Sequence, residues 1–370
     1  MSQPVCPYFG TCGGCAMQHI DYAIQLENKK KNLAQAIGFD AVTVFSDQEY
    51  GYRNRMDMVF HPGGLGFRER QSWTLIVDVK QCSISNERLN ALLKEILDFF
   101  GTEFDAFHVK KHTGTFRFAV IRTPKNDSCI SFVLGKNSTR LDEAIRKIEA
   151  FARVTSADNV LATYMSPETD MSIGSEYLVI KGKDELKATY LGKTFWYSAQ
   201  GFFQNNDVMA EKMHMYVHDL LEKYDRQWAH LLDLYGGVGT FGIINAELFP
   251  KGVTIVENFE GCVVSAKKNI QVNGITNAEA IVLDAMQLKK LRLPSPLFVI
   301  TDPPRSGMHP KTVEQLKKLE PKVIIYVSCN VQELKKDVPK FRDYKIKSAA
   351  VFDFFPQTNH MESVVELVRK

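Results

Sequence analysis

Three polar segments in the C-terminal half carry side chains that can do covalent chemistry. Each follows or flanks an apolar run that is typical of a strand. The segments are Asp302-Pro-Pro-Arg305, Ser328-Cys329-Asn330 and His360-Met-Glu362. If those strands share one parallel sheet, the segments converge on its rim, where a thiol can act as nucleophile and a carboxylate as general base.

A thiol and a carboxylate on such a rim suit the methylation of carbon 5 of a uracil. This carbon is too weak a nucleophile to attack a methyl donor, but a thiolate that adds to carbon 6 creates an enolate and activates it. A base must then remove the carbon-5 proton before the thiol can leave. We assign the addition to Cys329 and the proton removal to Glu362. Asp302 would orient the uracil, and Arg305 would contact a carbonyl or a phosphate.

A lone cysteine after a buried strand is more often a small hydrophobic core residue than a nucleophile. We interpret Cys129 and Cys262 in that way. Cys329 differs because it lies on the expected ligand-facing rim together with the segment 302–305.

A glycine-rich turn and two acids predict a cofactor site beside this rim. Gly237 and Gly239 follow the first strand, where glycine lets the backbone turn tightly and approach a ligand. Glu257 ends the second strand and can accept hydrogen bonds from ribose hydroxyls, while Asp284 ends the third and would meet an adenine. Acids at such positions also cap helices, and the turn alone would suit a dinucleotide oxidoreductase. Ligand-type residues after three successive strands favour a cofactor site.

The strands that position these residues alternate with helical stretches from about residue 198 onward. This alternation predicts βα units and a mostly parallel, doubly wound α/β sheet, whose ligands bind beyond the carboxyl ends of the strands. The expected strands are 230–234, 252–256, 280–283, 297–301 and 323–327, followed by 349–354 and 363–368.

Two further regions precede this sheet. Residues 50–197 favour a β-rich α+β structure, with a hairpin and one helix over 87–100. Residues 1–49 combine a glycine- and cysteine-rich loop with a helix of regular apolar spacing. We therefore expect three parts: 1–49, 50–197 and 198–370.

The composition fits a globular protein of the cytoplasm. The 370 residues are 45% hydrophobic and 24% charged, with no apolar run long enough to cross a bilayer and no leader pattern at the start. The net charge of +3 permits an RNA partner without demanding one. We interpret runs such as Lys29-Lys30-Lys31 as solvated faces, and we expect the seven cysteines to form no disulfides.

Taken together, these motifs resemble those of the RNA uracil-5-methyltransferase family. The matching segments are 202–205 (Phe-Phe-Gln-Asn), 233–239, 302–305, 328–330 and 360–362, in the family's order. The resemblance implies a Rossmann-like S-adenosylmethionine-dependent methyltransferase domain. It further implies that S-adenosylmethionine is framed by Gln204, Tyr235, Glu257 and Asp302, with Cys329 as nucleophile and Glu362 as base.

Two positions depart from the family's pattern. Gly236 stands where a cysteine is common, and Val331 stands where a proline usually follows the Cys-Asn pair. Neither departure removes a reacting group, although Val331 could shift the loop slightly.

The resemblance extends to the N-terminal cysteines. Cys6, Cys12 and Cys15, with Cys82 further on, are similar to the four-cysteine iron–sulfur ligand set of the family's ribosomal RNA branch. Spacing alone would suit a zinc ion equally well, but the resemblance favours a [4Fe–4S] cluster. Other members of that branch carry a β-barrel before the cluster, and the five residues before Cys6 leave no room for one. In this respect the chain resembles the compact members that methylate uracil 747 of 23S ribosomal RNA.

The resemblance thus implies a 23S ribosomal RNA (uracil-C5)-methyltransferase. We expect a monomer that binds this RNA, with no DNA or membrane partner. Residues 50–197 would face the RNA, where Arg53 and Arg55 beside Tyr52 suit stacking on unpaired bases. The target uracil would flip out of its stack to reach Cys329.

Other classes fit these motifs less well. An RNA cytosine-5-methyltransferase places a second cysteine beside the fourth-strand proline, and an amino-methylating enzyme favours Asn-Pro-Pro-aromatic there. A radical S-adenosylmethionine enzyme needs Cys-x3-Cys-x2-Cys, a spacing that the sequence lacks. Two alternatives stay open: a different ribosomal or transfer RNA uracil as target, and a catalytically silent RNA-binding assembly factor. Cys329 and Glu362 argue against the second.

Overall fold

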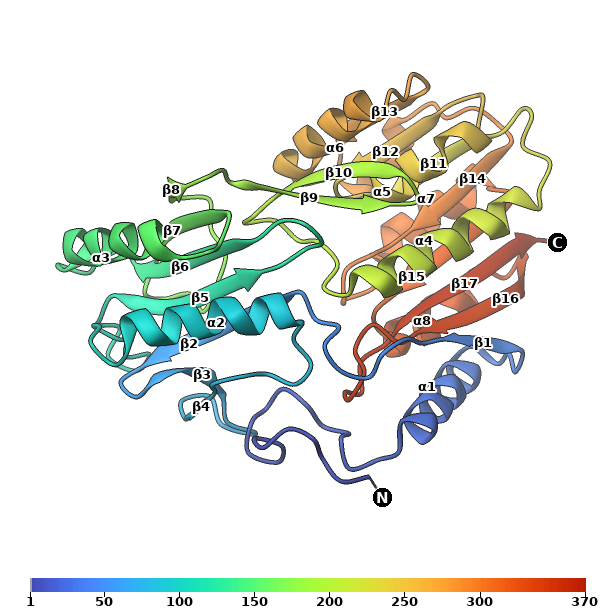
Figure 1. The fold of residues 1–370 in the computed structure, drawn as a ribbon. Coiled ribbons are helices and arrows are strands. Elements are labelled where there is room, and N and C mark those ends of the chain that lie inside the picture. Colours follow the sequence, from blue (N-terminus) through green and yellow to red (C-terminus); the bar gives the residue numbers. More distant parts are fainter. Residues whose placement is uncertain (1) are drawn as a thin grey trace.

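The computed structural model describes residues 2–370 and contains two large sheets (Figure 1). The larger sheet has eight strands in the order β1-β16-β17-β15-β14-β11-β12-β13. Its strands pair in parallel except β17, which runs antiparallel to both neighbours. The strands are β1 (Val42–Phe45), β11 (His230–Leu234), β12 (Val253–Glu257), β13 (Ala278–Val282), β14 (Leu297–Thr301), β15 (Val323–Ser328), β16 (Tyr344–Phe352) and β17 (Glu362–Arg369).

Helices cover both faces of this sheet. Every residue of β11, β14 and β15 is buried, as expected for strands packed on two sides. One face packs α4 (Asp207–Glu222), α5 (Thr240–Ile244) and α6 (Glu260–Val272), and the other packs α1 (Tyr22–Ile37), α7 (Pro310–Leu319) and α8 (Val331–Asp337). The short 3₁₀ segments are η1 (Ala246–Leu248), η2 (Ala285–Lys290) and η3 (Val338–Lys340). The predicted doubly wound, mostly parallel α/β sheet is confirmed.

The second sheet has seven strands in the order β4-β3-β2-β5-β6-β7-β8, covered by two helices. Its core is rich in phenylalanine, with Phe60, Phe100, Phe132 and Phe151 in mutual contact. The predicted helix over 87–100 is confirmed. The elements are β2 (Arg55–His61), β3 (Gly64–Arg68), β4 (Ile76–Asp78), α2 (Glu87–Phe100), β5 (Phe116–Arg122), β6 (Cys129–Gly135), α3 (Leu141–Val154), β7 (Asn159–Met165) and β8 (Tyr177–Lys181).

We call the eight-stranded sheet with its helices the C-terminal body and the seven-stranded sheet with α2 and α3 the central body. The hairpin of β9 (Glu185–Tyr190) and β10 (Lys193–Ser198) shares the core of the C-terminal body, and so does β1, which pairs Val42 with Ala349. Two segments from the N-terminal side of residue 198 therefore complete the C-terminal body. The division at 49/50 and 197/198 stays a prediction.

Residues 2–20 form a loop that touches both bodies (Figure 1). Cys12 forms a β-bridge with Glu69 of the central body. The backbone N–H groups of Ala16 and Met17 both donate to the carbonyl of Gln357 in the C-terminal body, at 2.9 and 3.0 Å. The cysteine-rich loop thus joins the two sheets.

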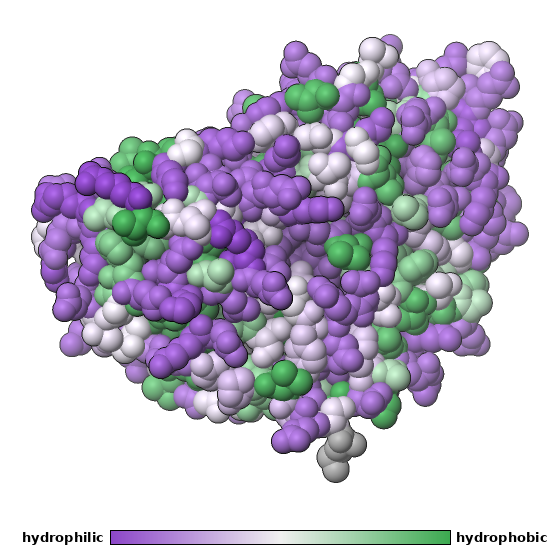
Figure 2. Space-filling view, viewed as in Figure 1, coloured by the Kyte–Doolittle hydropathy of each residue, from purple (hydrophilic) through white to green (hydrophobic). Residues whose placement is uncertain are grey.

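The surface is mainly polar on the face shown in Figure 2, where apolar patches are small and scattered. Across residues 2–370, no helix is both long and apolar enough to cross a membrane.

Burial of α1 against the C-terminal body predicts a large effect of one leucine. Leu33 is fully buried, so Leu33→Ala should lower the free energy of unfolding by about 2–5 kcal/mol through lost contacts and a cavity. Ile24→Ala on the same helix removes a 54% exposed side chain and should change it by less than about 0.5 kcal/mol. Denaturant titrations followed by circular dichroism measure both, and equal effects would contradict the packing of α1 described above.

Candidate active site

A cavity of about 1070 Å³ lies where the carboxyl ends of the parallel strands meet the cysteine-rich loop and β2. Its wall combines residues from the C-terminal body, the central body and the loop that joins them. The predicted site residues that line it are Gln204, Tyr235, Gly237, Glu257, Asp302, Arg305, Cys329 and Glu362, together with Cys6, Cys12, Cys15 and Cys82.

The register of β15 against β17 brings the thiol and the carboxylate together. Ser328 pairs with Ser363, and the Ser363 hydroxyl donates to the Ser328 carbonyl at 3.0 Å. Cys329 directly follows Ser328 and Glu362 directly precedes Ser363, so both residues lie at the same end of this antiparallel ladder. Both line the cavity.

Asn330 ties two of the three chemical segments to each other. Its side-chain N–H donates to the Arg305 carbonyl at 2.8 Å, and its oxygen accepts from the Gln332 backbone N–H at 3.0 Å to cap α8. Val331, which departs from the family's proline, is buried as the first residue of this helix. The helix after Cys329 therefore starts normally without the proline.

Burial and neighbouring charge control the titration of this cluster. Burial, with smaller contributions from the charges of Glu362 and Asp302, raises the pKa of Cys329 to about 11, and Arg305 acts in the opposite direction. Burial also raises the pKa of Glu362 well above its usual range, with a contribution from Asp302. Burial raises the pKa of Asp302 to about 7. The free site thus disfavours simultaneous ionisation of these groups, and its carboxylate is a stronger base than an exposed one.

The glycine-rich turn forms the other side of the cavity. Tyr235 and Gly237 both adopt left-handed backbone conformations, with φ of 61° and 52°, and a side chain at Gly237 would meet open space. The Gly237 backbone N–H donates to Glu257 Oε2 at 3.2 Å. Glu257 Oε1 accepts from the backbone N–H groups of Asn258 and Phe259 at 2.8 and 2.9 Å. The turn and the end of β12 therefore fix one carboxylate at the cavity wall.

Two predicted cofactor residues lie outside this wall. Gly239 starts α5 and packs near Ile243 and Ile255. Asp284 caps η2, where its Oδ1 accepts from the Met286 backbone N–H at 2.7 Å. The capping role that the sequence left open is the contact observed at Asp284.

The four N-terminal cysteines line the cavity with free, half-buried thiols. Burial raises the pKa of Cys12, and raises that of Cys15 to about 11, with smaller contributions from the other three thiols of the set. Four thiols on one wall are a suitable donor set for a metal centre. Within residues 2–370, however, no three His, Cys, Asp or Glu side chains are arranged to hold a metal ion, so these thiols share a wall without converging on one point.

Asp57 is part of the wall that the sequence motifs did not indicate. It forms a two-contact ion pair at 2.8 Å with Arg55, which was expected to face RNA, on the cavity side of β2, where alternation along the strand was the available signal. Cys129 is buried in the core as interpreted, but Cys262 also lines the cavity, near Glu257. Only the position of α6 against β12 reveals Cys262.

Comparison with known proteins places these features in context. The family described as tRNA (Uracil-5-)-methyltransferase matches residues 21–370. The tRNA (uracil(54)-C(5))-methyltransferase of Pyrococcus abyssi is 31% identical over 370 residues, covering 99% of this chain and 86% of the relative. An uncharacterised RNA methyltransferase of Caldanaerobacter subterraneus is 33% identical, and the match covers 97% of this chain and 83% of that relative.

A solved structure shares the fold over most of its length. The crystal structure of Pyrococcus abyssi tRNA (uracil-54, C5)-methyltransferase in complex with S-adenosyl-L-homocysteine superimposes with a TM-score of 0.80. It is 29% identical in sequence, and the match covers 96% of this chain and 86% of that one.

The charges around Cys329 predict the pH dependence of its alkylation. Because its pKa is raised to about 11, the rate with iodoacetamide should still rise steeply near pH 10. Glu362→Gln removes a negative neighbour, which favours the thiolate, so the profile should move to lower pH by about one unit.

Peptide mass spectrometry of the alkylated protein separates Cys329 from the other thiols. Cys262 is the internal control, because burial raises its pKa to about 11 with Glu257 as its charged neighbour. A Cys329 profile that stays in place, or a Cys262 profile that moves equally, would contradict the assignment of this charge cluster.

Proposed function

We propose a substrate and residue roles for this chain, which belongs to the tRNA (uracil-5-)-methyltransferase family. The chain is an S-adenosylmethionine-dependent methyltransferase that acts on carbon 5 of uracil in RNA. One observation carries the residue roles: Cys329 and Glu362, at the same end of the β15–β17 ladder, line one cavity together with Gly237 and Glu257.

Cys329 is the proposed nucleophile. Its thiol loses a proton to water, and the sulfur bonds to carbon 6 of the uracil while the carbon 5–carbon 6 electron pair moves into an enolate. Arg305 lowers the pKa of the thiol and can donate to the enolate oxygen. Asp302, on the same wall, orients the ring.

Glu362 is the proposed base of the second half of the reaction. When bound, S-adenosylmethionine would supply the methyl group to carbon 5 of the activated ring, with cleavage of its sulfur–methyl bond and release of S-adenosylhomocysteine. Glu362 then removes the carbon-5 proton, the sulfur–carbon 6 bond breaks and the carbon 5–carbon 6 double bond returns. Its raised pKa suits this task, because a stronger base takes a carbon-bound proton more readily.

The cofactor is proposed to lie along the glycine-rich turn. Gly237 would let the backbone approach it, and Gln204 and Tyr235, which line the same cavity, would frame it. Glu257 Oε1 already accepts two backbone N–H groups, whereas Oε2 accepts one and keeps a lone pair for a ribose hydroxyl. Asp284 and Gly239 keep their proposed roles near the adenine and in the turn, although neither lines the cavity.

The proposed substrate is uracil 747 of 23S ribosomal RNA, on the strength of the four-cysteine set. Uracil 54 of transfer RNA is the second candidate, because the Pyrococcus relatives bear that activity in their names. Arg53 and Arg55 on the cavity wall would meet either RNA, and Phe202, which is 65% exposed there, offers a ring for stacking. A flipped uracil would enter the cavity from this side.

A [4Fe–4S] cluster is the proposed occupant of the four-thiol wall. Cys6, Cys12 and Cys15 would hold it from the loop and Cys82 from the central body. The backbone N–H of Cys82 donates to Asn90 Oδ1 at 2.8 Å, which fixes the position of that cysteine. Such a cluster would supply a cross-link between loop and sheet. The methylation described above needs no electron transfer, so its proposed role is structural.

RNA that contains 5-fluorouracil should trap the enzyme covalently. Fluorine cannot leave carbon 5 as a proton does, so wild type with S-adenosylmethionine should form a denaturation-resistant adduct that Cys329→Ala abolishes. Cys129→Ala, which removes a buried thiol outside the cavity, should still form it. An adduct that persists in Cys329→Ala, or none in wild type, would refute the proposed nucleophile.

Mapping the adduct on 23S ribosomal RNA and on transfer RNA separates the two candidate substrates. Attachment at uracil 747 supports the first, and attachment at uracil 54 replaces it by the second.

Metal content tests the cluster. Protein purified without oxygen should contain about four iron and four sulfide per chain, and Cys82→Ser should lose them. Cys262→Ser, a thiol of the same cavity outside the set, should keep them. Elemental analysis decides the outcome, and zinc in place of iron would overturn the cluster in favour of a four-thiolate zinc site.

A further inference from the structure

The segment between β16 and β17, residues 353–361, is a turn that is largely buried from solvent. It leaves the sheet at Phe352 and returns at Glu362, and these two residues pair across the ladder. Its centre is buried, with Phe354 fully buried and Gln357 only 1% exposed. Three of its residues, Phe355, Thr358 and His360, line the cavity. Connecting segments normally lie on the surface, because buried backbone groups need partners.

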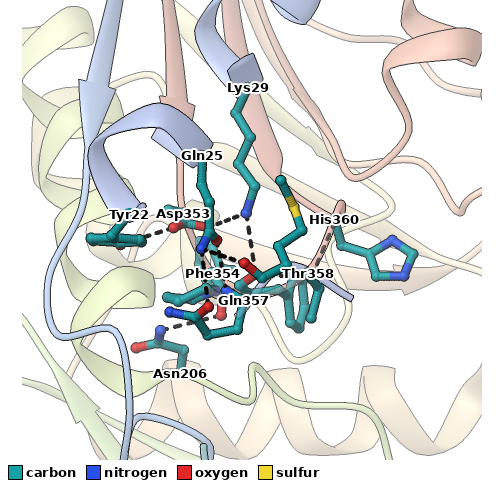
Figure 3. Close-up of polar contacts among 12 residues, drawn as sticks. Tyr22, Gln25, Lys29, Asn206, Asp353, Phe354, Gln357, Thr358 and His360 are labelled. Carbon is teal, nitrogen blue, oxygen red and sulfur yellow. Dashed lines mark hydrogen bonds and ion pairs between the residues drawn. The ribbon is translucent and has the colours of Figure 1, made fainter. Parts of the chain in front are cut away.

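Four successive carbonyls of this turn accept hydrogen bonds from four separate parts of the chain, and Figure 3 shows Asn206 and Lys29 among the donors. Three of these parts lie outside the C-terminal half: the cysteine-rich loop, α1 and the segment that precedes β2. Phe354 accepts from Asn206 at 3.2 Å, Phe355 from Lys29 at 3.2 Å, Pro356 from Tyr52 at 3.0 Å, and Gln357 from Ala16 and Met17.

Gln357 is the centre of this arrangement. Its φ of 68° is a left-handed conformation that a non-glycine residue rarely adopts, so surrounding contacts must hold it. Gln25 of α1 does so reciprocally: its amide donates to Gln357 Oε1 at 3.0 Å, and its oxygen accepts from the Gln357 backbone N–H at 3.1 Å. The same Gln25 amide donates to the carbonyls of Met17 and Ile20.

Lys29 and Asp353 fix the start of the turn. The Lys29 side chain is 4% exposed, the Asp353 side chain is fully buried, and the two form an ion pair at 2.6 Å. The Tyr22 hydroxyl donates to the other Asp353 oxygen at 2.9 Å. Removing two charges from water costs much of what their attraction returns, so such a pair sets position more than it adds stability.

We propose that Gln25, Lys29 and Gln357 are positioning residues that hold the 353–361 turn so that Glu362 meets carbon 5 of the methylated uracil. This inference rests on the proposed role of Glu362. The β15–β17 ladder supports both Cys329 and Glu362, but Cys329 is held in addition by the Asn330 contacts at the start of α8, whereas Glu362 directly follows the turn. Loosening the turn therefore affects proton removal while sparing addition and methyl transfer.

The test is a single-turnover comparison on RNA transcripts carrying tritium at carbon 5 of uracil, using whichever of 23S ribosomal RNA and transfer RNA forms the fluorouracil adduct. Gln25→Leu removes the contacts to Gln357 at nearly constant volume. It should form the methylated adduct within about twofold of the wild-type rate but release tritium roughly 10- to 100-fold more slowly, because a base displaced by about an ångström loses that much. Methylated adduct on unfluorinated RNA should then accumulate.

Further variants guard against a simple folding defect. Lys29→Met combined with Asp353→Asn removes both buried charges and should show the same split, while Lys29→Arg should restore tritium release in part. Lys31→Met is the matched control on α1, since Lys31 is 63% exposed and pairs only with exposed Glu27, and it should leave both steps unchanged.

A structural role alone would lower adduct formation and tritium release in the same proportion, and that result, or two unchanged steps, overturns the inference. Wild-type protein with 5-fluorouracil RNA runs in parallel. Absence of its adduct overturns the proposed function itself, whereas its presence without a split in the variants overturns only the role of these three residues.

Discussion

The antiparallel pairing of β17 with β15 is the constraint on which the site depends. The chain leaves β15 at Ser328 and enters β17 at Glu362, and the ladder between the two strands brings a thiol and a carboxylate to the same end of the sheet. A slip of one residue would turn one of the two side chains to the other face of the sheet. Burial of both strands on two faces prevents that slip, so the core that stabilises the fold also protects the chemistry.

Several carboxylic acids lie buried at the same edge of the sheet, where burial disfavours their ionised forms. Burial raises the pKa of Asp233 and of Asp302 to about 7, and raises that of Glu362 beyond its usual range. Asp233 has a positional task, because its Oδ2 accepts from the Gly242 backbone N–H at 2.8 Å and so seats α5 behind the glycine-rich turn. The edge consequently carries less negative charge than its composition suggests, which suits the approach of a polyanionic nucleic acid.

Local pattern was enough to predict most strands of the eight-stranded sheet and the rim on which the reactive residues meet. It worked because those features depend on apolar runs and on the general geometry of parallel sheets. It failed where long-range packing decides the environment. Lys29, in a run interpreted as a solvated face, is buried beside Asp353, and Cys262, interpreted as a core residue, faces the cavity. Nothing near Gln25 in the sequence indicates that its partner is Gln357.

The pairing of β1 with β16 has a consequence for how the protein is made. Val42 can pair with Ala349 only after nearly the whole chain has been synthesised. In the sheet, β17 lies between β15 and β16, which both precede it in the sequence. Closing so long a loop is slow, and contacts between distant residues dominate this topology. During synthesis, therefore, α1 and the cysteine-rich loop are present before the strands and turn that they contact in the folded protein. The nascent chain exposes the apolar face of α1 in that interval, and chaperones are suited to shield such a surface.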